Sequence, residues 1–178
     1  MKNVVIVSSS LHAISSSKLI CEKIKEGLED NGNQVKFVDL KDVDLKFCIG
    51  CLACQKTGKC VINDDVKNYL DDISNADVLI FASPIYYYSI TGQLKTFLDR
   101  LNPLYIRENK FKKIYLVATC ADTDENAING SVEAIQGFVN CFDGVEFGGY
   151  FLGTGIEQAT DLDGTNYLEN AYLFGKNI

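Results

Sequence analysis

Residues 4–28 read VVIVSSSLHAISSSKLICEKIKEGL, and this segment is the clearest indication of the fold class. Its first four residues form a continuous β-branched run, which is typical of a strand buried on both faces of a sheet. A hydroxyl-rich segment follows, and apolar residues then recur at helical spacing at Leu19, Ile20, Ile24 and Leu28. The stretch therefore predicts a buried strand, a polar loop and a helix that ends at Asn31-Gly32.

The same alternation of strand and helix continues along the chain. Apolar runs predict four more strands, at residues 35–40, 76–83, 114–119 and 145–152. Helical spacing predicts helices after Asp64-Asp65 (carrying Val66, Tyr69, Leu70 and Ile73), at 91–101, at 131–142, and a short one within about the last twenty residues. This order predicts one α/β domain over residues 1–178, a five-stranded parallel sheet with helices on both faces. Ligands of such sheets bind beyond the carboxyl ends of the strands, so the loops after Val7, Ser83 and Thr119 are the candidates.

Composition excludes several classes of protein. The chain has 178 residues, of which 47% are hydrophobic and only two are proline, so disordered and collagen-like classes are excluded. A formal net charge of −7 disfavours nucleic acid as a partner. The longest apolar runs, about five residues, are too short for a membrane span, and residues 4–7 are too short for a signal peptide. We therefore expect a cytoplasmic protein with no membrane association.

The serine-rich loop, residues 8–17, joins the first predicted strand to the first predicted helix. Hydroxyl groups and the unpaired N–H groups of a helix start suit a phosphate dianion without a lysine. The alternative is a serine-rich turn with an ordinary N-cap. Neither a dinucleotide-binding glycine motif nor a Walker loop is present. His12, the single histidine, is expected to face solvent, with assistance to a bound phosphate as the alternative. One histidine disfavours a histidine-based metal site or catalytic triad.

Two more loops are predicted to reach the same edge of the sheet. Pro84 stiffens the exit of the third strand, and three tyrosines, Tyr86, Tyr87 and Tyr88, follow it. At least one of these rings should line a crevice, where its face can meet a planar ligand; otherwise they pack on neighbouring loops or on a partner subunit. Residues 119–123 end the fourth strand, and Cys120 there has no evident base, so we interpret it as a wall of the crevice.

The serine loop, the segment Ser83-Pro84-Ile85-Tyr86 and the sequence TGQLKTFLDR at 91–100 together resemble the NADPH-dependent FMN reductase family. The resemblance covers nearly the whole chain and implies a flavodoxin-like fold with strand order 2-1-3-4-5. The first loop of that family usually reads G-S-P-R-x-x-x-(S/N)-(S/T). Here Ser9, Ser15 and Ser16 match its phosphate-binding hydroxyls, whereas Ser8, Ser10 and Leu11 replace the glycine, the proline and the arginine. Losing that arginine removes a bidentate phosphate partner.

The resemblance also implies the cofactor and its site. FMN is expected with its phosphate on the serine loop, at Ser9, Leu11, Ser15, Ser16 and Ser17. The isoalloxazine ring is expected against two further segments, Pro84, Ile85, Tyr86 and Tyr87 on one and Thr119, Cys120 and Ala121 on the other.

Four of the seven cysteines, Cys48, Cys51, Cys54 and Cys60, lie within thirteen residues. In a reducing compartment such thiols are metal ligands, redox groups or packing groups rather than disulfides. Close C-x2-C-x2-C spacing suits a cubane, and the segment resembles the iron–sulfur flavoproteins, which carry a [4Fe–4S] cluster beside FMN. A zinc site or a set of reduced thiols that pack a subunit interface are the alternatives.

These patterns favour an FMN-dependent oxidoreductase with NAD(P)H as donor and a flavin, a quinone or a protein as acceptor. No side chain is predicted to act as a catalytic acid, base or nucleophile. A flavodoxin-like electron carrier and a cysteine-based metal or redox sensor are the alternatives. The resemblance implies a homodimer or homotetramer, and exposed apolar residues at 86–88 and 48–54 would supply an interface.

Overall fold

The structure is a computed structural model that describes residues 1–178. Its centre is one parallel sheet of five strands in the order β2-β1-β3-β4-β5. The strands are β1 (Asn3–Ser8), β2 (Gln34–Asp39), β3 (Val78–Pro84), β4 (Lys113–Thr119) and β5 (Glu146–Gly153). The predicted flavodoxin-like sheet and its strand order are confirmed.

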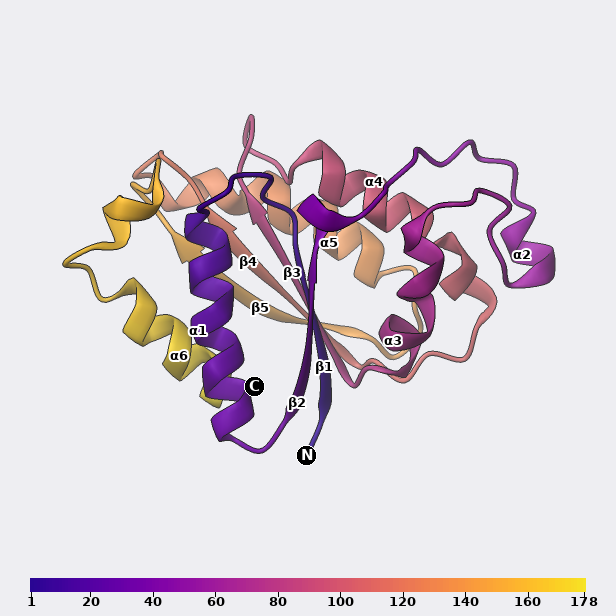
Figure 1. The fold of residues 1–178 in the computed structure, drawn as a ribbon, viewed down its shortest axis with the longest axis horizontal. Coiled ribbons are helices and arrows are strands. Elements are labelled where there is room, and N and C mark those ends of the chain that lie inside the picture. The colour runs from indigo at the N-terminus through magenta and orange to yellow at the C-terminus, as the bar shows by residue number, and fades with distance from the viewer.

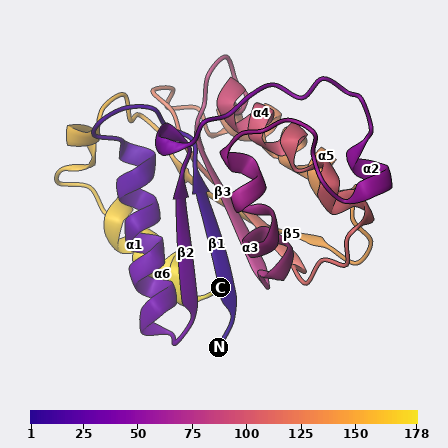
Figure 2. The same cartoon turned by 45° about the vertical axis from the view of Figure 1, so that its right-hand side comes forward.

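Helices cover both faces of the sheet, as Figures 1 and 2 show. On one face lie α1 (Ser16–Asp30) and α6 (Tyr167–Lys176), and on the other lie α3 (Leu70–Asn75), α4 (Gly92–Arg100) and α5 (Asn129–Val139). The short helix α2 (Cys54–Thr57) belongs to a long loop that extends away from the sheet between β2 and α3 (Figure 1). None of the helices combines the length and the apolar character that crossing a membrane requires.

The sheet separates two layers of core, because successive strand side chains point to opposite faces. Val5 and Val7 of β1 pack in the layer beneath α3, α4 and α5. Val4 and Ile6 pack in the layer beneath α1 and α6. All four side chains are buried, which confirms that the first strand is covered on both faces.

One predicted helix is divided in two. Asp64 accepts the N–H of Val66 at 3.2 Å, as a cap should, but it begins a short 3₁₀ turn, Asp65–Asn68, and α3 starts only at Leu70. Asp65 does not share the capping role; its carboxylate instead accepts the N–H of Asp44 at 2.8 Å. This hydrogen bond joins the two ends of the loop that carries the cysteines, at Asp44 and at Asp65.

Close packing of α1 on α6 depends on glycine. A Cβ atom at Gly175 would overlap the carbonyl oxygen of Ile24 in α1, whereas a Cβ at Gly137 of α5 would meet nothing. Gly175→Ala should therefore lower the free energy of unfolding by about 1–3 kcal/mol, because the helices must separate. Gly137→Ala should raise it by about 0.5–1 kcal/mol through helix propensity. Urea unfolding of both variants tests this, and a similar change in both would contradict it.

Candidate functional site

The carboxyl ends of β1, β3 and β4 converge on a crevice of about 520 Å³. Its walls come from the three loops named from the sequence and from the loop that follows β5. The residues that line it are Ser10, His12, Ile14, Ser15, Ser16, Ser17, Pro84, Ile85, Tyr86, Thr119, Cys120, Ala121, Ile156, Glu157, Gln158 and Ala159. Nine of the twelve residues predicted to hold the cofactor are therefore brought together at one site.

One end of the crevice is built for an anion. Ser15 caps α1, and its Oγ accepts the N–H of Lys18 at 3.3 Å and lies 3.0 Å from the Oγ of Ser17. The N–H groups of Ser16 and Ser17 donate to no acceptor within the chain. These N–H groups carry the partial positive charge of the helix start, and neighbouring hydroxyls add further donors. The donor set fits a phosphate group.

Ser9 and Leu11, which are also predicted to contact the phosphate, are not among the residues that line this crevice. Ser9 is buried, and its Oγ donates to the carbonyl of Ala82 at 2.8 Å and accepts from the hydroxyl of Thr91 at 2.9 Å. Its hydroxyl is therefore occupied in joining β1 to β3 and to the cap of α4. Leu11 is half-exposed and lies outside the lining.

The tyrosine segment forms a tight turn. Tyr86 and Ser89 exchange backbone hydrogen bonds of 3.0 and 3.1 Å, and the two residues between them are left-handed, with φ of 49° at Tyr87 and 60° at Tyr88. Left-handed backbone in two bulky residues is strained, and such strain gathers at functional sites. Tyr86 lines the crevice as predicted.

The other two tyrosines of the turn point elsewhere. Tyr87 is fully exposed and lies outside the crevice lining, so the structure does not bring it together with the other predicted ring contacts. The hydroxyl of Tyr88 donates to the carboxylate of Asp122 at 3.1 Å, which raises the pKa of Tyr88. This bond joins the turn after β3 to the loop after β4.

The third wall consists of Thr119, Cys120 and Ala121. Cys120 is buried, and its thiol lies 3.3 Å from the carbonyl of Asp122, to which it donates. Burial raises the pKa of this thiol, so it stays protonated at neutral pH. It is a wall of the site rather than a nucleophile.

Sequence reasoning missed the part of the lining that follows β5. The loop after β5 reaches the crevice because Ile156 donates its N–H to the carbonyl of Cys120 at 2.8 Å, which brings residues 156–159 alongside. No residue pattern in 156–159 marks them as ligand-binding. His12, expected to face solvent, is exposed and also lines the rim. The lining contains no lysine or arginine, so a bound phosphate would rely on helix N–H groups, hydroxyls and the imidazole.

The four clustered cysteines lie on the long loop between β2 and α3. Cys48 and Cys51 are exposed, Cys54 is buried, and Cys60 is partly buried. No three cysteine, histidine, aspartate or glutamate side chains in residues 1–178 are gathered into a metal site. The thiols nevertheless supply the four sulfur donors that a cubane needs, so the chemistry of the donor set fits while its side chains are not gathered around one point.

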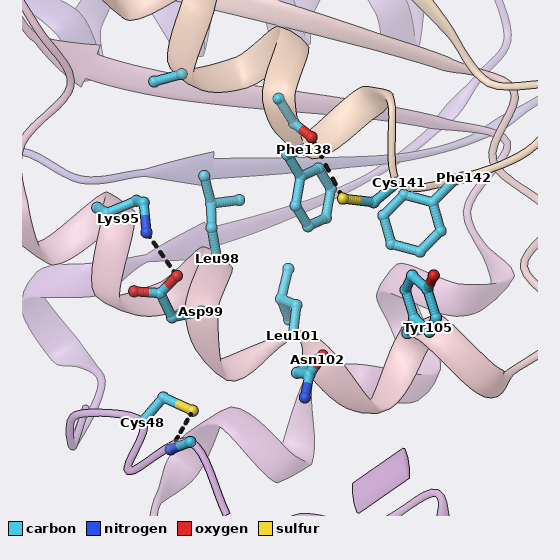
Figure 3. A pocket seen from close by; sticks show the side chains of 13 residues that line it. Cys48, Lys95, Leu98, Asp99, Leu101, Asn102, Tyr105, Phe138, Cys141 and Phe142 are labelled. Carbon is cyan, nitrogen blue, oxygen red and sulfur yellow. Dashed lines mark hydrogen bonds and ion pairs between the residues drawn. The ribbon is translucent and has the colours of Figure 1, made fainter. Parts of the chain in front are cut away.

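A second pocket, of about 580 Å³, lies between this loop, α4 and α5. Figure 3 shows Leu98, Leu101, Tyr105, Phe138 and Phe142 around it, with Cys48 and Asn102 on the side of the cysteine loop. Its rim carries the ion pair of Lys95 and Asp99, whose atoms lie 2.6 Å apart. None of its lining residues belongs to the crevice, so the two cavities are separate.

Comparison with known proteins gives relatives that include several iron-sulfur flavoproteins. It is 27% identical to an iron-sulfur flavoprotein of Methanocaldococcus jannaschii, over 97% of this chain and 93% of that protein. It is 37% identical to an iron-sulfur flavoprotein of Archaeoglobus fulgidus over 103 residues, which span 58% of this chain and 46% of that protein.

Solved structures with the same fold include an NAD(P)H:quinone oxidoreductase from Methanothermobacter marburgensis and an azoreductase from Bacillus anthracis. The first has a TM-score of 0.74 at 18% identity and covers 99% of this chain and 95% of its own. The second has a TM-score of 0.69 at 18% identity and covers both chains fully. The profile of the NADPH-dependent FMN reductase family matches residues 1–153. The chain therefore belongs to the NADPH-dependent FMN reductase family.

Proposed function

We propose that this oxidoreductase binds FMN in the crevice and passes electrons from NADPH or NADH to a flavin, a quinone or a protein acceptor. The single observation that carries the proposal is the crevice itself, with an anion-binding helix start at one end and aromatic and apolar walls at the other. When bound, FMN accepts a hydride from reduced nicotinamide and releases electrons to an acceptor.

The chain's own residues would bind and orient this cofactor. Ser16 and Ser17 offer free N–H groups to the phosphate, while Pro84 and Tyr86 present an apolar surface to a planar ring. The protonated Cys120 adds no charge to the opposite wall. Since hydride transfer needs no acid or base from the protein, we assign no catalytic side chain.

Titration of the refolded apoprotein with FMN tests the proposal, followed by NADPH and NADH oxidation with free flavin or quinone as acceptor. We expect quenching of flavin fluorescence at one FMN per chain and rapid oxidation of one nucleotide. A protein that binds FMN but oxidises neither nucleotide would instead be an electron carrier like flavodoxin. Absence of quenching would overturn the assignment of the crevice.

We further propose that Cys48, Cys51, Cys54 and Cys60 are the ligands of a [4Fe–4S] cluster. The compact spacing, the thiol donor set and the names of the relatives support this. Zinc on the same thiols is the competing assignment. An absorbance spectrum of anaerobically purified protein separates the two, because a cluster adds broad visible absorption and zinc adds none.

We also propose that the chain forms a homodimer or homotetramer. Apolar side chains stand in water on the cysteine loop and on the tyrosine turn, among them Phe47 at 78% exposure, Ile49 at 70% and the fully exposed Tyr87. A second copy would cover such a patch isologously.

Tyr87→Asp should weaken this assembly without unfolding the protomer, because the side chain touches little of its own chain and a buried charge without a partner is costly. Light scattering should give a multiple of the 19.7 kDa chain mass for the original protein and a smaller mass for the variant. A monomeric original protein at micromolar concentration, with FMN bound, would contradict the proposal.

A further inference from the structure

Arg100, the last residue of α4, is 1% exposed and is the largest fully buried side chain in the molecule. One of its terminal nitrogens, Nη1, donates to the carbonyl of Lys46 at 2.9 Å and to the carboxylate of Asp64. The other, Nη2, donates to the second oxygen of Asp64 at 3.0 Å and to the sulfur of Cys60 at 3.5 Å. The guanidinium thus contacts both ends of the cysteine loop and one of its thiols.

Asp64 completes this junction. Its carboxylate also accepts the N–H groups of Lys46 at 3.0 Å and of Val66 at 3.2 Å. Burial would raise the pKa of Asp64, but the guanidinium of Arg100 and these N–H donors hold it below its usual value, so the pair is charged. The base of the loop, from Lys46 to Asp64, is therefore closed by a buried ion pair.

A second donor comes from the same segment. Asn102, two residues after Arg100, donates its side-chain N–H to the sulfur of Cys54 at 3.2 Å. Figure 3 shows Asn102 on the side of the second pocket that faces the cysteine loop. Cys54 and Cys60 thus each receive an N–H donor, from Asn102 just after α4 and from Arg100 at its end, whereas Cys48 and Cys51 are exposed.

The guanidinium is not saturated by these contacts. Its Nε–H is buried and has no acceptor in the chain. A buried donor without a partner costs free energy, and a cation beside a thiol favours added negative charge on the sulfur. If Arg100 served only to close the loop, its contacts to Lys46 and Asp64 would suffice. That role does not explain why Arg100 and Asn102 also donate to the sulfurs of Cys60 and Cys54.

We infer that Arg100 and Asn102 are positioning residues of the metal centre on this loop. Arg100 holds Cys60 and Asn102 holds Cys54 in place as ligands, and both residues stabilise negative charge on these sulfurs. The inference rests on the proposed [4Fe–4S] assignment and extends it to residues outside the cysteine motif. Hydrogen bonds to cluster sulfurs favour the reduced state, so they raise the reduction potential.

Asn102→Leu is the decisive variant, because it keeps the approximate size of the side chain and removes the carboxamide that donates to Cys54. Arg100→Lys keeps the charge but loses the bidentate geometry, and Asn170→Ala, at an exposed position of α6, is the matched control. Each protein is reconstituted anaerobically with iron and sulfide, and iron content and midpoint potential are measured. FMN binding in the crevice reports whether each variant is folded.

We expect Asn102→Leu to retain iron with a more negative midpoint potential, Arg100→Lys to lose iron and shift its remaining potential in the same direction, and the control to match the original protein. A wild-type potential in Asn102→Leu would overturn the inference. So would loss of iron in both variants with no shift in potential, since that pattern indicates loop closure alone.

A titration with Co²⁺ separates this inference from the cluster proposal, because thiolate–cobalt absorption reports the same ligands without iron. Asn102→Leu should bind Co²⁺ about 10-fold more weakly than the control. If the original protein takes up Co²⁺ but no iron, the cluster proposal fails. The positioning role of Asn102 is then tested by the Co²⁺ affinity of Asn102→Leu against that of the control. If it takes up neither metal, both are overturned.

Discussion

Ser16→Asp is expected to lower the affinity for FMN by at least about 100-fold, which corresponds to a loss of ~3 kcal/mol in binding free energy. The variant replaces a hydroxyl that can donate to the phosphate by a carboxylate that repels it. Ser16 is the first residue of α1 and lines the crevice, and its N–H has no acceptor in the chain. A carboxylate at this position would satisfy the helix start itself and would repel the phosphate. Fluorescence titration of the apoprotein with FMN measures the effect.

Riboflavin provides the control for this variant, because it carries the same ring without the phosphate. Its affinity should be nearly equal in the original protein and in Ser16→Asp. Equal losses for FMN and riboflavin would mean that the ring site has been disturbed, and an unchanged FMN affinity would place the phosphate elsewhere.

Cys54→Ala is expected to abolish cluster assembly. Among the four clustered thiols, Cys54 is the buried one, and Asn102 already donates to its sulfur. Anaerobic reconstitution of the original protein should yield ~4 iron atoms per chain, and the variant should yield almost none. Iron and sulfide analysis together with visible absorption measure the difference.

Cys141→Ala is the matched control, since Cys141 is exposed and lies outside the cysteine loop. It should assemble the same amount of iron as the original protein. Full iron content in Cys54→Ala would remove Cys54 from the ligand set. Equal loss in both variants would mean that free thiols in general, rather than this motif, bind the iron.

The sheet, most of the helices and the location of the crevice could be predicted from the order of residues alone. The β-branched run at residues 4–7 predicts a strand covered on both faces, and β1 is buried on both. The helix N-caps are also local features of the sequence. Ser15 and Thr91 each accept an N–H of the helix that they precede. These features depend on neighbours in sequence and on the period of the hydrophobic pattern, so they can be predicted without the fold.

Which of the candidate residues line the crevice depends on the folded chain. Ser9 has the same side chain as Ser16, yet its hydroxyl is occupied by β3 and by Thr91, 82 residues away. Tyr87 follows Tyr86 directly, yet a left-handed turn directs it into solvent. Residues 156–159 join the lining because backbone hydrogen bonds, among them the one from Ile156 to Cys120, hold the loop after β5 against the loop after β4. Such outcomes depend on partners far apart in the chain.

Arg100 illustrates the same limit at the cysteine loop. In the sequence it ends an amphipathic helix, where an arginine ordinarily faces water and favours the helix dipole. In the fold it is buried against Asp64, Lys46 and Cys60, which lie 36 to 54 residues away. A buried charge is stable only where a carboxylate and several hydrogen-bond acceptors surround it. Periodicity does not encode that environment, because it forms only when the loop between β2 and α3 folds back onto the end of α4.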